Sequence, residues 1–122
     1  MIQPIAAGLT LIVAALHVGF LILEMVLWQG EAGRAVTGYS AEDAAMTAVL
    51  AANQGLYNGF LAAGLIWGVI ANKRDVRLFF LACVVFAGLY GAWSAGSSTI
   101  LALQAAPGAL ALLLTALAGR GK

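Results

Sequence analysis

Four long apolar stretches, separated by short polar connections, organise the chain. The first runs from Ile5 to Trp28 and the second from Met46 to Ala71. The third covers Val76 to about Trp93, and the fourth covers about Ser98 to Ala118. Each stretch reaches or approaches the ~20 residues that a helix needs to cross the hydrocarbon core of a bilayer. The pattern therefore predicts four transmembrane helices, at about residues 5–28, 46–71, 76–93 and 98–118.

The polar connections contain residues that begin and end helices. In the first connection, Ser40 can cap a helix with its hydroxyl, while Glu42 and Asp43 favour the positive end of the helix dipole. The second connection is the charged turn "NKRDVR", and the third is the small polar segment "AGSS". Ser97 or Ser98 in this segment can cap the last helix.

The composition identifies the solvent in which these helices fold. Of the 122 residues, 63% are hydrophobic and 9% are charged, and the mean hydropathy is +0.99. Soluble domains carry about a quarter charged residues. The prediction is an all-α, integral membrane four-helix transmembrane bundle that forms a single domain over residues 1–122, with the lipid bilayer as its surroundings. The net charge of +1 excludes nucleic acid as a partner, and the single cysteine, Cys83, can form no disulfide within the chain.

Basic residues predict how the helices are oriented. Lys73, Arg74 and Arg77 lie in the second connection, and Arg120 and Lys122 lie at the C-terminus. The first connection contains one arginine and the third contains none. Because basic loops stay in the cytoplasm, both termini are predicted to be cytoplasmic, in the cytoplasmic (inner) membrane of a bacterium.

Polar side chains within the predicted spans gather at central and outer depths. Counting about 1.5 Å per residue, His17 lies near the bilayer centre and Glu24 lies roughly 10 Å further out, on nearly the same helix face. The remaining polar side chains at these depths are Asn53, Gln54, Tyr57, Asn58, Tyr90, Ser94 and Gln104. This distribution predicts a ligand-binding pocket in the outer half of the bilayer, lined by these residues together with His17 and Glu24.

Glu24 and His17 are the candidate catalytic or ligand-pairing residues. An ionisable side chain inside a membrane helix costs ~2.5 to 3.5 kcal/mol at the centre, so a functional role is the first hypothesis. The structural alternatives are that Glu24 reaches interfacial water one turn before Trp28 and that His17 only bonds another helix. No metal site is predicted, because the chain has a single histidine. No cofactor is predicted either, and haem held by His17 as its one axial ligand is the alternative.

Small residues recur at every fourth position of the second stretch. They are Ala51, Gly55, Gly59 and Ala63, with Gly64 and Gly68 forming a second "GxxxG". This spacing lets helix backbones approach closely, and it predicts packing against the small residues of the third helix, Gly88 and Gly91 among them. The neighbouring amides then face either the pocket or another helix.

Two segments resemble a known family. They are "HVGFLILEMVLW", from His17 to Trp28, and "NQGLYNGFLAAG", which begins at Asn53. Both are similar to the signature of a bacterial membrane-protein family called domain of unknown function 1304, and the resemblance extends over nearly the whole chain. It implies a small protein of about four transmembrane helices and brings no established activity.

Three classes of function remain open. The preferred one is binding or transport of a small amphipathic molecule or ion, with Glu24 pairing a cation or proton. The second is a membrane-embedded enzyme, an isomerase or hydrolase of a lipophilic substrate, in which Glu24 and His17 exchange protons. The third is a structural subunit of a membrane complex. Because four short helices enclose only a modest cavity, a homo-oligomer is expected.

Overall fold

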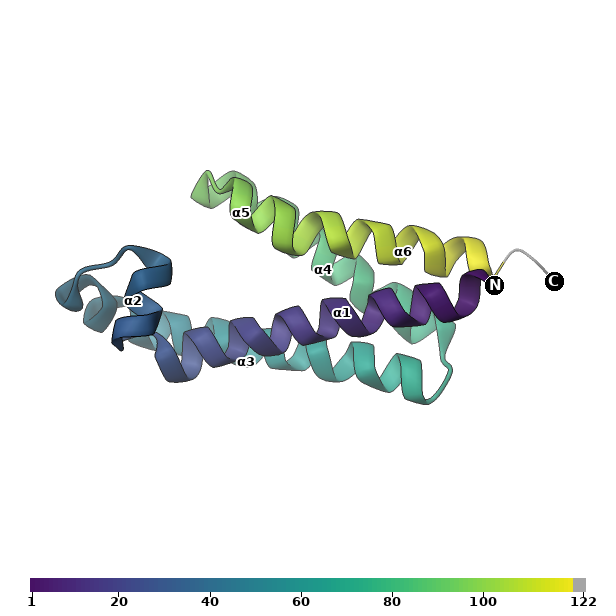
Figure 1. Cartoon of the computed structure of the whole chain (residues 1–122), viewed down its shortest axis with the longest axis horizontal. Helices are drawn as coiled ribbons and strands as arrows, with labels where there is room; N and C mark the ends of the chain where they lie inside the picture. The colour runs from purple at the N-terminus through teal and green to yellow at the C-terminus, as the bar shows by residue number, and fades with distance from the viewer. Residues whose placement is uncertain (120–122) are drawn as a thin grey trace. The chain divides into compact units, whose positions relative to one another are not determined.

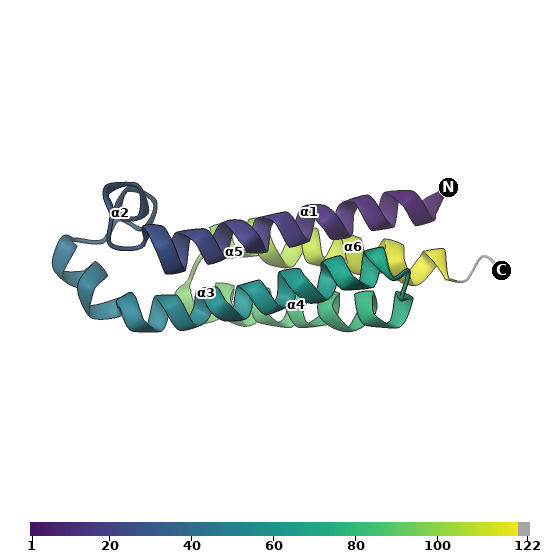
Figure 2. The same ribbon diagram turned by 90° about the horizontal axis from the view of Figure 1, so that it is seen from below.

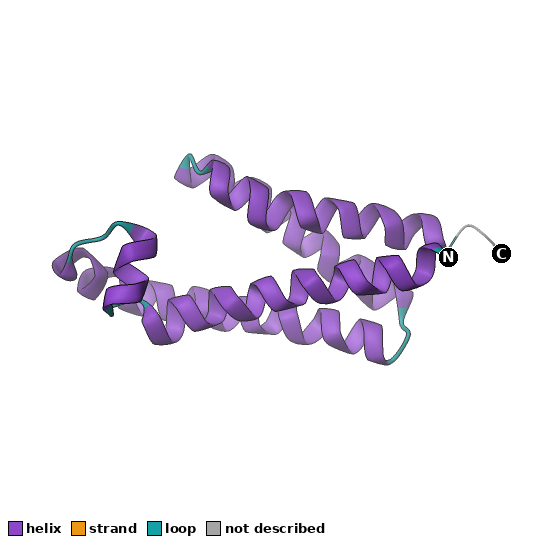
Figure 3. Cartoon of the chain, viewed as in Figure 1, coloured by secondary structure: helices purple, strands orange, loops and turns teal. Residues whose placement is uncertain are grey.

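The computed structural model describes residues 1–119, which are built of helices joined by short loops (Figures 1 and 3). The order begins with α1 (Ile2–Ile22), the π-helical segment η1 (Leu23–Leu27), α2 (Glu31–Thr37) and α3 (Ala41–Ile70). It continues with α4 (Arg74–Ala95), α5 (Ser98–Ile100), the π-helical segment η2 (Leu101–Ala105) and α6 (Ala106–Ala118). The four predicted stretches are helical, and α2 is an additional helix. Arg120 and Lys122, used above for the orientation, lie outside the described residues.

Three of these helical stretches are long and apolar enough to cross a membrane, which indicates an integral membrane protein. Within the described chain they are Ile2–Leu27, Arg74–Ala95 and Ser98–Ala118. They correspond to the first, third and fourth predicted spans. α3 has 30 residues and a length of about 45 Å, but its polar residues lower its hydropathy. Of the four expected spans, three are therefore supported by length and composition.

The predicted helix caps are present. The Asp43 backbone N–H donates to Ser40 Oγ at 3.1 Å, and Ser40 Oγ donates to Asp43 Oδ2 at 2.9 Å. The Ile100 backbone N–H donates to Ser97 Oγ at 3.3 Å, so Ser97 caps the last helical stretch. Both serines satisfy N–H groups that a helix start would otherwise leave without a partner.

The described chain forms two compact units. Unit 1 consists of Met1–Leu16 with the described part of Leu61–Lys122, and unit 2 is His17–Phe60. α1 and α3 each contribute residues to both units.

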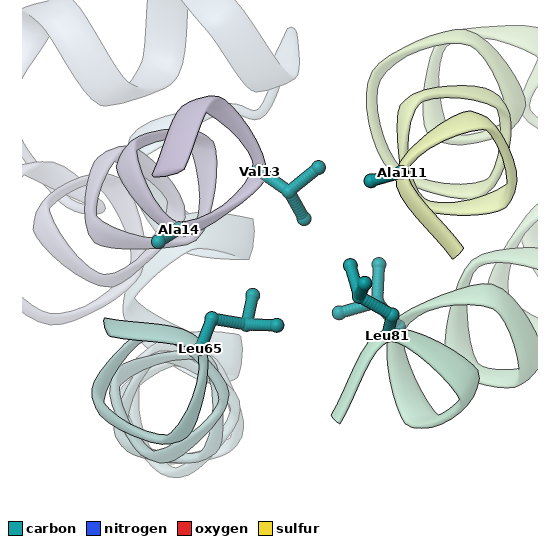
Figure 4. Packing of buried hydrophobic residues seen from close by; sticks show 6 residues of the cluster. Val13, Ala14, Leu65, Leu81 and Ala111 are labelled. Atoms are coloured by element: carbon teal, nitrogen blue, oxygen red, sulfur yellow. The ribbon is translucent and has the colours of Figure 1, made fainter. Parts of the chain in front are cut away.

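Unit 1 has an apolar core to which four helices contribute. Its buried members are Val13 and Ala14 of α1, Leu65 of α3, Leu81 and Val84 of α4, and Ala111 of α6. Figure 4 shows Val13, Leu65, Leu81 and Ala111 converging from their helices. Leu65 and Leu81 are the largest aliphatic side chains of this core, and both are fully buried. Close packing of this kind holds helices together in lipid, where burial alone gives little driving force.

Glycines set the helix contacts of unit 1. Gly64 lies against the ring of Phe80, and a Cβ on Gly68 would come within 2.7 Å of Arg77 Cγ. The predicted packing of this glycine pair on the third helix is thus correct. Gly88 of α4 lies against Ala105, whose backbone N would be 2.7 Å from an added Cβ. The expectation that Gly88 faces the second stretch is wrong, because Gly88 packs against the last helical stretch instead.

In unit 2 the glycine ladder contacts α1 and η1. A Cβ on Gly55 would lie 2.6 Å from Met25 Cγ and 3.0 Å from Glu24 Cβ. A Cβ on Gly59 would lie 2.7 Å from Leu21 Cδ1. These two glycines were expected to pack on the third helix, and that prediction is wrong. Their absent side chains leave room for the end of the first helix.

Candidate functional site

Unit 2 is a helical hairpin whose two arms are joined through α2. Trp28, just after η1, donates its Nε1–H to Thr47 Oγ1 of α3 at 3.0 Å. The Trp28 ring also meets the ring of Tyr39 edge to face, with centroids 5.7 Å apart. Gly33 of α2 lies against the Leu27 carbonyl, where any side chain would overlap the backbone. Figure 2 shows α2 beside the end of the first helix. These contacts fix the end of η1 against the start of α3.

Glu24 is the second residue of η1 and is half-buried. In a π-helical turn each N–H bonds five residues back, which widens the helix, and such turns occur frequently at functional sites. The segment Leu23–Leu27 contains no proline or glycine that would predict it. The seven-residue relation between His17 and Glu24 assumed a regular α-helix, and that geometry ends at Ile22.

Asn58 is the partner of Glu24. Asn58 Nδ2 donates to Glu24 Oε2 at 2.8 Å, and the Asn58 side chain is 4% exposed. The bond joins η1 to α3, one helical turn from the close approach at Gly55. Hydrogen bonds to an ionised group are stronger than neutral ones, so this bond orients the carboxylate. The other carboxylate oxygen, Oε1, accepts no hydrogen bond from residues 1–119.

His17 is fully buried in unit 2. Its ring meets Phe20 edge to face, with centroids 5.2 Å apart. Within the described chain no hydrogen bond or ion pair joins His17 to Glu24. The residue that the structure brings to the carboxylate is therefore Asn58.

The other polar residues of α3 lie at the surface of unit 2. Asn53 is exposed and donates its Nδ2 to the Val49 carbonyl of its own helix at 2.8 Å. Gln54 is exposed, and Tyr57 is 59% exposed with its ring 6.0 Å from that of Phe60. Since these side chains point to the surface, they do not join Asn58 at Glu24.

The remaining predicted site residues belong to unit 1. Tyr90 is exposed and stacks at a tilt beside Trp93, at 5.8 Å between centroids. Ser94 is exposed, and its Oγ donates to the Gly91 carbonyl at 3.4 Å. Gln104 is half-buried within η2. This second π-helical segment has a cause in the sequence: Pro107 lacks the N–H that a regular α-helix would use there.

A comparison with protein-family models places residues 11–116 in the family described as protein of unknown function (DUF1304). The chain belongs to this family. The matched range contains Glu24, Asn58 and the other predicted site residues. No curated protein and no solved structure matches the chain.

The chemistry of the site in this DUF1304 protein follows from one carboxylate and one amide. Among the described residues, no group of three histidine, cysteine, aspartate or glutamate side chains gathers as a metal site would require. Glu24 can pair with a cation or accept a proton, and Asn58 holds one of its oxygens in place. Sequence reasoning proposed both residues but did not pair them, because the register that joins η1 to α3 depends on the contact at Gly55.

Proposed function

We propose that this protein binds or transports a small amphipathic molecule or ion, with Glu24 as the group that pairs with its positive charge. The observation that carries the proposal is the 2.8 Å bond from Asn58 to Glu24. A half-buried carboxylate in a helix long enough to span a membrane is costly, and such groups are functional by default. Asn58 leaves Oε1 of the carboxylate for a ligand.

The surroundings of Glu24 favour an amphipathic cation. Leu21 and Met25 lie on either side of it in sequence, against Gly59 and Gly55 of α3. Apolar side chains of this kind suit the body of a lipophilic ligand, while the carboxylate pairs with its charge. Few polar groups and one placed carboxylate are the usual composition of a small-molecule site.

The proposal includes a topology. α3 crosses the membrane in addition to the other three spans. Both termini face the cytoplasm, and the membrane is the inner membrane of a bacterium. The basic residues Lys73, Arg74 and Arg77, at the junction of α3 and α4, support this orientation. Glu24 then lies in the outer half of the bilayer.

Binding of tetraphenylphosphonium, a small amphipathic cation, tests the proposal. We compare the wild-type protein in detergent with Glu24→Gln and with Glu42→Gln, a matched change at an exposed residue in the first turn of α3. We expect saturable binding by the wild type and by Glu42→Gln, and an affinity at least about tenfold lower for Glu24→Gln. Glu24→Gln removes a charge-assisted contact worth about 1.4 kcal/mol or more, and each 1.4 kcal/mol is a factor of ten in affinity. Equal binding by all three proteins would refute the role of Glu24. Uptake of the same cation into proteoliposomes then separates transport from binding.

A second candidate function, a subunit of a homo-oligomer, is favoured by the exposed polar residues of α3. Asn53, Gln54 and Tyr57 carry donors and acceptors at the surface of unit 2. Asparagine and glutamine can bond the same residues of a second copy across a two-fold axis along the membrane normal. A lower mass of the double variant Asn53→Ala, Gln54→Ala than of the wild type, measured by light scattering with detergent subtracted, supports an oligomer. An unchanged mass counts against this interface.

A further inference from the structure

Arg77 is a buried positive charge in unit 1. The side chain is 2% exposed, and its Nη2 donates to Gln3 Oε1 of α1 at 3.3 Å. Its Nε is buried and has no hydrogen-bond partner among residues 1–119, and no carboxylate of these residues forms an ion pair with it. Asp75, in the same helical turn, is exposed. Buried charges are normally paired, and residues 1–119 give this guanidinium no counter-ion.

The chain makes room for this arginine. A Cβ on Gly68 of α3 would lie 2.7 Å from Arg77 Cγ and 3.1 Å from Arg77 N. Because Gly68 has no side chain, the aliphatic part of the Arg77 side chain packs directly against the backbone of α3. A side chain held in place only by electrostatic attraction would not need this close packing.

Arg74, one turn earlier, gives a contrast. Its Nε donates to the Thr115 carbonyl at 3.2 Å and its Nη2 to the Ala116 carbonyl at 2.9 Å. These carbonyls belong to the last turn of α6, where a cation also offsets the negative end of the dipole. Arg74 thus caps the end of α6, whereas the described part of that helix end, up to residue 119, accepts no hydrogen bond from Arg77.

Helix starts add donors at the same end of unit 1. α4 begins at Arg74, and its N-cap residue, Lys73, makes no side-chain capping bond. The start of α1, the turn between α3 and α4, and the end of α6 lie at the same end of unit 1 in both views of the chain (Figures 1 and 2). A helix start carries partial positive charge and free N–H groups, and helical side chains lean toward it. Arg77 is the fourth residue of α4, so this buried residue belongs to the first turn of a helix whose N-cap side chain makes no capping bond.

We propose that this end of unit 1 binds a phosphate-class anion through the Arg77 guanidinium and the first-turn N–H groups of α4. A phosphate oxygen accepts several hydrogen bonds at once, and helix starts and arginines are its usual partners. The phosphate belongs either to the headgroup of an anionic lipid or to free phosphate in solution. With the topology proposed above, this end faces the cytoplasmic leaflet, where basic sites between helices meet anionic headgroups.

Thermal unfolding of the full chain tests this site and separates the two sources. We measure the Tm in nanodiscs of phosphatidylcholine with and without phosphatidylglycerol, and in detergent with inorganic phosphate against chloride of equal ionic strength. The proteins are the wild type, Arg77→Gln, and Arg34→Gln, which loses the same charge in α2 of unit 2. A Tm rise of a few degrees with phosphatidylglycerol in the wild type and Arg34→Gln, lost in Arg77→Gln, identifies a lipid headgroup. The same pattern with inorganic phosphate identifies the free anion.

Two further measurements keep the test decisive where Arg77→Gln does not fold. Arg77→Lys keeps the charge but loses the planar donor set, so the anion-dependent rise in its Tm should be smaller than in the wild type. Native mass spectrometry of the wild type, released from membranes that contain phosphatidylglycerol, should show a bound anionic lipid or phosphate. No Tm response to either anion, together with no bound anion in the mass spectrum, would overturn the proposal. A response equal in the wild type and Arg77→Lys would also overturn the assignment to the guanidinium.

Discussion

The two units of this protein use the same packing device for different purposes. In unit 1, Gly64 makes room for the Phe80 ring and Gly88 for Ala105, beside a core of large aliphatic side chains. In unit 2, Gly55 lets α3 approach η1, and the buried residues that accompany it are polar or small. Close helix contact therefore produces an apolar core in one unit and a carboxylate paired with an amide in the other.

Burial makes the contrast specific. The large aliphatic side chains that are fully buried, Leu65, Leu81, Val13 and Val84, all belong to unit 1. The buried hydrophobic residues of unit 2 are Ala44 and Ala51, and its largest fully buried side chain is His17. A unit with few buried apolar contacts is expected to open at lower free energy, and binding elements are drawn from such regions.

The largest expected effect is in the core of unit 1. Leu81→Ala removes a fully buried side chain and should lower the free energy of unfolding by about 2–5 kcal/mol. Leu89→Ala, on the same helix at 49% exposure, is the control and should change it by less than about 0.5 kcal/mol. Denaturant titration in detergent micelles measures both. Equal losses would mean that unit 1 is not stabilised by the core described above.

The next effect is at the glycine ladder of unit 2. Gly55→Ala places a methyl group against Met25 and Glu24 and should cost about 1–3 kcal/mol of unfolding free energy. Gly59→Ala meets only the end of the flexible Leu21 side chain and should cost less. Gly19→Ala, with no neighbour within 4 Å, is the control that reports helix propensity alone. If Gly59→Ala proves the more costly change, the packing of α3 on η1 is misassigned.

The smallest expected effect on stability distinguishes two asparagines of α3, Asn58 and Asn53. Asn58→Ala leaves Glu24 without its donor and should lower stability by about 1–2 kcal/mol, since a half-buried carboxylate loses its hydrogen bond. Asn53→Ala removes a bond to the helix's own backbone at an exposed position and should change it by less than about 0.5 kcal/mol. The same titration measures both. A double variant with Glu24→Gln should show that only the Asn58 change is coupled to Glu24.

Much of the fold could be predicted from the sequence because it depends on local patterns. Apolar runs of sufficient length located the helices, and Ser40 and Ser97 marked two of their starts. α2 was not predicted, since Glu31–Thr37 lacks the apolar periodicity that signals a helix. Its position depends instead on Gly33, which only a tertiary contact with Leu27 explains.

The candidate site could be predicted only in part. Depth counting proposed Glu24 and Asn58 but grouped them with Asn53, Gln54 and Tyr57, which lie at the surface of unit 2. Whether a residue of α3 faces η1 or the surface depends on which helix packs against Gly55 and Gly59. The π-helical turn at Glu24 was equally invisible, because Leu23–Leu27 contains no residue that breaks a helix.

Chemical labelling at Glu24 tests the central claim most directly. Dicyclohexylcarbodiimide reacts with carboxyl groups in apolar surroundings, and mass spectrometry of peptides locates the modified residue. We predict that Glu24 is modified in the wild-type protein and that tetraphenylphosphonium slows this reaction in proportion to its occupancy, while labelling of the exposed Glu42 is unaffected by the cation. Modification of Glu24 at the same rate with and without the cation would contradict the assignment of Glu24 as the ligand-pairing group.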